Sequence, residues 1–172
     1  MMKQKKTKYL LILIIFSFYI ILAGCGTKPI ERDLEGFLGI VWEENVSNAV
    51  SILRDNNFRI MYSDDRGIGA EGLFLDEEVY LTLLFSNNRF YIVSISFRNK
   101  INLIEVYNKT IDLLIEKYGR PYLVHREFPG IPTKSTTWRF RNNCSISIYF
   151  DSELNFINIQ SSNNTILNEA TN

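Results

Sequence analysis

The sequence contains few of the residues that build catalytic or metal centres. Histidine occurs once, as His125, and cysteine twice, as Cys25 and Cys144, among 172 residues. A single histidine excludes a zinc site with several histidine ligands, and two cysteines allow at most one disulfide bond within the chain. The sequence also lacks a P-loop and the G-x-S-x-G turn of serine hydrolases. These absences argue against an enzyme, a metal site and a bound cofactor.

A basic patch is missing as well. The 19 basic and 19 acidic residues balance, but four lysines (Lys3, Lys5, Lys6, Lys8) precede residue 25 and no acidic residue does. Residues 25–172 therefore carry 15 basic and 19 acidic residues, a net charge of −4. Nucleic-acid binding needs clustered lysine and arginine, so this mildly acidic domain is not expected to bind nucleic acid.

The clearest motif lies in residues 1–25. After the four lysines comes an apolar run from Tyr9 to Ala23, interrupted only by Ser17. This run is shorter than the about 20 residues that span a membrane, and it is typical of a signal peptide. It ends in Leu22-Ala23-Gly24-Cys25, which resembles the lipobox of bacterial lipoproteins.

The lipobox resemblance implies that residues 1–24 are a signal peptide and that acyl chains on Cys25 anchor the mature chain in a membrane. Two acyl chains anchor stably, because each buried CH₂ contributes about 0.8 kcal/mol. The alternative is an uncleaved N-terminal membrane helix. The expected location is the cell envelope. In a Gram-negative host this is the outer membrane, because Gly26 after the lipidated cysteine resembles the context for sorting to that membrane. In a Gram-positive host it is the outer leaflet of the plasma membrane.

The 148 residues after the signal peptide have the length of one domain. Residues 25–36, with Pro29 and several charges, are expected to be a tether, and the polar residues 161–172 a flexible tail. The domain between them, residues 37–160, opens with Phe37-Leu38-Gly39-Ile40-Val41-Trp42. This stretch is similar to the F-x-G-I-x-W-G opening of small, uncharacterised exported bacterial proteins.

Hydrophobic periodicity predicts two helices, at 45–56 and 102–118, each followed by four strands. Asn45 is expected to cap the first helix, Asn102 and Glu105 to form a capping box on the second, and Gly119 to end it. Gly67 to Gly72 match a dinucleotide-binding spacing, but no helix follows, so a bulged turn is expected. The predicted strands are 58–63, 68–75, 79–85, 89–97, 122–128, 135–141, 144–150 and 155–160.

This pattern predicts an α+β fold with two helices packed on one face of an antiparallel sheet. The strings Leu83–Asn87 and Ile148–Ser152 match in the two halves, 37–97 and 98–160, which favours a tandem repeat of one helix and four strands. The order of elements resembles the β-lactamase-inhibitor-protein-like folds and the related small outer-membrane assembly lipoproteins, which mostly bind proteins. The resemblance implies a protein-interaction module of the cell envelope.

The alternative function is a carrier or sensor that holds a small apolar ligand between helix and sheet. A carrier needs space on the inner face of the sheet, where the sequence instead places bulky side chains such as Leu81, Phe85 and Trp138. A filled core is therefore expected, with Cys144 buried in it.

Strand alternation also defines the opposite, outer face. Apolar side chains expected there form a candidate patch for a protein partner, because exposed aromatic residues often anchor interfaces. Tyr80, Phe90 and Tyr149 are the expected anchors. The candidate residues are Tyr80, Leu84, Phe90, Ile92, Tyr149 and Phe156.

Overall fold

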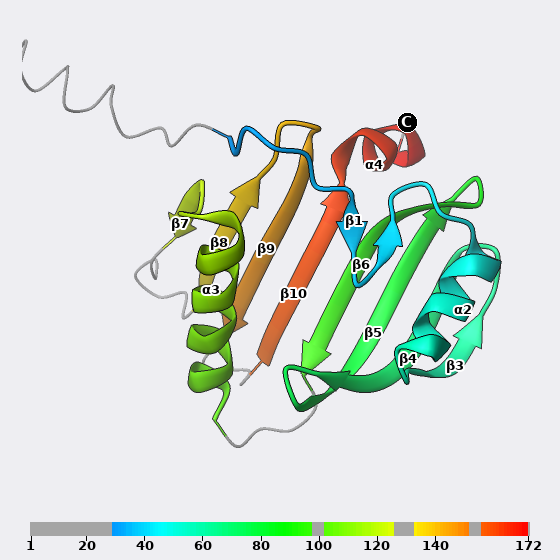
Figure 1. Ribbon diagram of the computed structural model, residues 1–172, viewed down its shortest axis with the longest axis horizontal. Coiled ribbons are helices and arrows are strands. Elements are labelled where there is room, and N and C mark those ends of the chain that lie inside the picture. Colours follow the sequence, from blue (N-terminus) through cyan, green and yellow to red (C-terminus); the bar gives the residue numbers. More distant parts are fainter. Residues whose placement is uncertain (1–28, 98–101, 126–132, 152–155, 172) are drawn as a thin grey trace, which may run out of the picture.

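The computed structural model describes residues 29–97, 102–125, 133–151 and 156–171, and Cys25 with the signal peptide lies outside this part. Its main feature is an eight-stranded antiparallel sheet in the order β3-β4-β5-β6-β10-β9-β8-β7 (Figure 1). A separate two-stranded hairpin is formed by β1 and β2. The elements are β1 (Gly36–Phe37), β2 (Ile40–Val41), α2 (Val46–Asp55), β3 (Arg59–Ser63), β4 (Gly67–Phe74), β5 (Glu77–Ser86), β6 (Arg89–Phe97), α3 (Leu103–Tyr118), β7 (Leu123–His125), β8 (Thr133–Arg139), β9 (Cys144–Asp151), β10 (Phe156–Asn163) and α4 (Asn164–Thr171).

The helices α2 and α3 lie on the same face of the sheet (Figure 1). One contacts β3 and β4 and the other contacts β9 and β10, with the β1–β2 hairpin between them. Beneath them the inner side chains of the central strands are buried in one core. This filled inner face agrees with the bulky residues predicted there. Its largest enclosed members are Trp138, Phe90, Ile40, Leu53, Ile68, Leu81, Leu83, Ile95, Ile146, Ile148, Ile157 and Ile159.

Local capping explains where α2 begins and where α3 ends. Asn45 caps α2, since its side-chain oxygen accepts a hydrogen bond from the Asn48 amide at 2.9 Å. The last turn of α3 closes at Gly119, which has φ +80° and donates its amide to Ile115 O at 2.7 Å. At the start of α3 the Asn102 side chain donates to Glu105 Oε2 at 3.0 Å and caps no backbone amide. Neither of the two side-chain to backbone bonds of a capping box is present between these two described residues, so the predicted capping box is wrong.

The fold-class prediction of two helices on a sheet is wrong. The described residues are mostly strand and form three helices, an eight-stranded sheet and a two-stranded sheet. Both β1–β2 and α4 lie outside a scheme of two units with one helix and four strands. None of the described helices has the length and apolar character needed to cross a membrane.

The ends of the domain are more ordered than the sequence indicated. Strand β10 continues to Asn163, and α4 occupies most of the stretch expected to be a flexible tail. The Asn163 side chain caps α4 by accepting hydrogen bonds from the amides of Thr165 and Ile166. Ile166 is buried outside the main core cluster. One asparagine of this polar stretch, Asn163, is therefore a helix cap, and the prediction of a flexible tail did not take it into account.

Candidate functional site

The outer face of the sheet carries two transverse rows of side chains, because the strand register aligns residues from β3 to β7. The central row contains no charged residue and consists mostly of small polar side chains. The tyrosine row next to it contains Tyr80 and Tyr149. In sheet order the central row is Tyr62, Gly69, Thr82, Ser94, Gln160, Ser147, Thr137 and Leu123, and the tyrosine row is Arg59, Glu71, Tyr80, Ser96, Asn158, Tyr149 and Ser135.

The sequence-predicted candidates on this face divide into two patches. The β3–β6 patch contains Tyr80, Leu84 and Ile92, all half-buried. The β9–β10 patch contains Tyr149 and Phe156, each 40% exposed. Strands β6 and β10 separate Tyr80 from Tyr149, which places their backbones about 14 Å apart at the usual strand spacing.

A neutral polar strip lies between the two patches. The amide of Asn158 donates to Ser94 Oγ at 2.6 Å and to Ser96 Oγ at 3.2 Å across the β10–β6 pair. In the central row beside the β9–β10 patch, Thr137 and Ser147 share a 3.0 Å hydrogen bond between β8 and β9. These polar groups are hydrogen-bonded within the sheet, so a partner that covers them leaves none of them without a hydrogen bond.

Phe90 does not belong to the outer face, and its prediction is wrong. The register shifts between Leu84 and Phe85, so that Leu84 pairs with Ile92 and Phe85 pairs with Phe90. Tyr91 is the extra residue of this β-bulge, which turns Phe90 toward the core.

Long-range contacts hold Phe90 there. Its ring is fully buried and stacks on Trp42, with the ring centroids 5.0 Å apart. Its amide donates to Glu44 O at 2.9 Å, and its carbonyl accepts from the Glu43 amide at 3.1 Å. The stretch around Trp42 therefore covers Phe90 on the inner side.

Tyr62 is an outer-face aromatic that the sequence analysis missed. It lies on the edge strand β3 opposite Gly69, where a Cβ atom would come within 2.0 Å of the tyrosine ring. Burial and a hydrogen bond with Tyr80 raise the pKa of Tyr62. The sequence signal for Tyr62 was Gly69, because a glycine leaves room for a ring from the next strand.

The stretch Gly67–Gly72, expected as a bulged turn, is instead part of strand β4.

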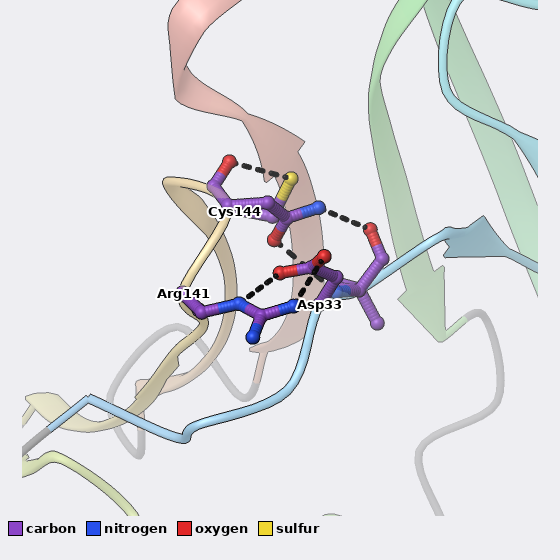
Figure 2. A network of polar contacts seen from close by, with 5 residues as sticks. Asp33, Arg141 and Cys144 are labelled. Atoms are coloured by element: carbon purple, nitrogen blue, oxygen red, sulfur yellow. Dashed lines mark hydrogen bonds and ion pairs between the residues drawn. The ribbon is translucent and has the colours of Figure 1, made fainter.

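An N-terminal strap, residues 29–35, runs along the ends of β8 and β9 in place of the expected free tether (Figure 1). The Ile30 amide donates to Arg139 O at 2.8 Å. Figure 2 shows Arg141 donating two hydrogen bonds to the Asp33 carboxylate, at 3.0 and 2.9 Å. This pair holds the pKa of Asp33 below its usual value, chiefly through the hydrogen bond. Leu34 is buried beside it.

Cys144 lies next to this strap and is buried, as predicted. Burial and, to a lesser extent, the Asp33 carboxylate raise the pKa of the thiol to about 12. Its Sγ donates to Asn142 O at 3.6 Å. Strand β8 separates β9 from β7, which carries His125, so the two residues are not on adjacent strands. A protonated, enclosed thiol is a poor nucleophile.

On the inner side, an apolar groove of about 780 Å³ lies between α3 and the β1–β2 hairpin. Residues Thr110 to Tyr118 of α3 contribute one wall, and residues 36–41 the other. Phe74 and Leu75, at the tip of the β4–β5 hairpin, also line it. The groove is built from three segments that are distant in sequence, which is why periodicity did not predict it.

In the described part of the chain, no group of three His, Cys, Asp or Glu side chains is arranged to hold a metal ion. The chain matches no protein-family model, no curated protein and no solved structure.

Proposed function

We propose that this chain is a lipid-anchored interaction module of the bacterial cell envelope, which docks another envelope protein on its outer sheet face. The observation that carries the proposal is the arrangement of two aromatic patches around a neutral polar strip. Interface cores are depleted of charged residues and enriched in aromatic side chains. On the outer face the central row is uncharged across eight strands, and Tyr62, Tyr149 and Phe156 supply exposed aromatic rings in or near it.

The two helices and the hairpin occupy the inner face, which leaves the outer face for a partner. Tyr62 and Tyr149 are the most favourable anchors, because 44% and 40% of their surfaces are exposed. Tyr80 supports Tyr62 through their hydrogen bond. Leu84 and Ile92 lie near α4, since Ile92 pairs with Ser162 just before that helix, and they form the margin of the β3–β6 patch.

The membrane part of the proposal rests on the lipobox Leu22-Ala23-Gly24-Cys25. Acylation of Cys25 tethers the domain through the three residues that precede the strap. Radiolabelled palmitate should enter the wild-type chain and not the Cys25→Ser variant. Equal labelling of both variants would remove the anchor from the proposal.

Pull-down from the native host tests the docking face. We expect Tyr62→Ala with Tyr149→Ala to reduce partner recovery by about 30-fold or more, since truncated hot-spot residues typically cost at least about 2 kcal/mol. The matched control is Ile104→Ala with Ile115→Ala on α3, where 42% and 39% of the side chains are exposed. Unchanged recovery with a folded outer-face variant, or equal loss with the α3 control, contradicts the proposal.

A further inference from the structure

The groove between α3 and the β1–β2 hairpin belongs to neither the core nor the outer face. Its apolar lining includes Leu113, which is 39% exposed, and Val41, which is 50% exposed. Its volume of about 780 Å³ lies within the range of small-molecule sites, roughly 300 to 1,000 Å³. From these features we propose that the groove binds the hydrocarbon chain of a free single-chain amphiphile. This site is independent of the outer face.

Backbone strain marks the wall of the groove. The loop Leu38-Gly39 has φ values of 55° and 80°, and the loop Leu75-Asp76 has values of 56° and 67°. Each joins two strands as a two-residue loop with both residues left-handed, a geometry that favours asparagine and glycine and disfavours leucine.

The same chain shows the relaxed solution at Asn87-Asn88, where the β5–β6 hairpin uses asparagine with φ values of 51° and 58°. Both strained leucines, in contrast, line the groove. Strained residues cluster at ligand sites, and an apolar occupant packing on these leucines accounts for their presence at both hairpin tips.

The dimensions of the groove fix the length of the occupant. The α3 wall runs from Thr110 to Tyr118, a rise of about 12 Å along the helix. An extended chain advances about 1.2 Å per bond, so this wall accommodates about ten carbons. At the Leu75 end, Lys109 Nζ reaches the Leu75 carbonyl at 3.4 Å and links α3 to the hairpin tip.

The charges around the groove point to recognition of the chain and not of its headgroup. Glu35, Glu116 and Lys117 belong to the lining. Arg32 lies 4.6 Å from the centre of the Tyr118 ring and donates to the Lys117 carbonyl. Glu35 and Glu116 balance Arg32 and Lys117 in charge, and the Lys109 ammonium at the Leu75 end is bound to the Leu75 carbonyl. Neither an anionic nor a cationic headgroup is therefore favoured.

Photoaffinity labelling of the full chain in membranes tests the proposal. The probes are diazirine-bearing alkyl chains of about 6 to 14 carbons with a carboxylate or a trimethylammonium headgroup, and labelled peptides are mapped by mass spectrometry. The key variant is Leu113→Lys, and its control is Ile115→Lys, because both side chains are 39% exposed on α3 and only Leu113 lines the groove. The ratio between the two variants cancels partitioning of each probe into the membrane.

We expect labels on α3 and residues 36–41, a loss of about tenfold in Leu113→Lys, and little change in Ile115→Lys. Competition by unlabelled chains should strengthen about fourfold per methylene up to about ten carbons and then level off, with either headgroup. The proposal is overturned if the two variants label equally or if labelling depends on one headgroup. It is also overturned if competition keeps strengthening beyond about ten carbons. Labelling that appears only in the Cys25→Ser variant also overturns the proposal, because it would mean that the acyl group on Cys25 fills the groove in the wild-type chain.

Discussion

Phe90 is fully enclosed by the core, whereas 40% of the Tyr149 surface is exposed to solvent. Phe90→Ala should therefore lower the free energy of unfolding by about 3–5 kcal/mol, through lost burial and the cavity beside Trp42. Tyr149→Ala should change it by less than about 0.5 kcal/mol, as is usual for surface positions. Urea denaturation followed by circular dichroism measures both. Similar values for the two variants would refute the bulge that separates their faces.

The Cys144 thiol should resist alkylation in the folded protein. With a pKa of about 12, only about one thiol in ten thousand is ionised at pH 8, and the thiolate is the reactive form. Maleimide labelling should be slow in native buffer and fast in denaturant, where the pKa returns to its ordinary value. Because the pKa is raised, native labelling should quicken as pH rises. Rapid native labelling at pH 8 would show that the strap leaves the thiol accessible.

At the scale of elements, the Leu75-Asp76 hairpin loop offers a test of strain. Leu75→Asn should raise the free energy of unfolding by about 1 kcal/mol, since asparagine adopts the left-handed conformation more readily. The reciprocal control is Asn87→Leu, which places leucine in the relaxed loop of the β5–β6 hairpin and should destabilise by a similar amount. Thermal unfolding of both variants supplies the comparison. Destabilisation by Leu75→Asn would mean that leucine packing outweighs the backbone strain.

Local signals predicted the elements that depend on local chemistry. The cap at Asn45 and the stop at Gly119 lie where the sequence placed them. The bulge at Tyr91 was not predictable from alternation, because it follows from the stacking of Phe90 on Trp42 and from hydrogen bonds with residues 43 and 44. Such contacts between distant segments override the period of a strand.

At the scale of the whole molecule, part of the candidate site followed from the pattern of the strands. Tyr80, Leu84 and Ile92 share the outer face because each alternates with a buried neighbour. Tyr62 was missed because its position depends on the pairing of β3 with Gly69. The apolar groove was missed because the packing of α3 beside two hairpins creates it. The position of Tyr62 and the groove therefore depend on the pairing and packing of distant segments, which local sequence patterns do not predict.

Site-specific photo-crosslinking in the native host tests the docking proposal most directly. A photoreactive amino acid replaces Tyr149 on the outer face or, as the control, Ile104 on α3, because these side chains are 40% and 42% exposed. The account predicts a discrete adduct with an envelope protein from position 149 and none from position 104. Adducts only from position 104, or none from position 149 in a folded and membrane-bound chain, would contradict it.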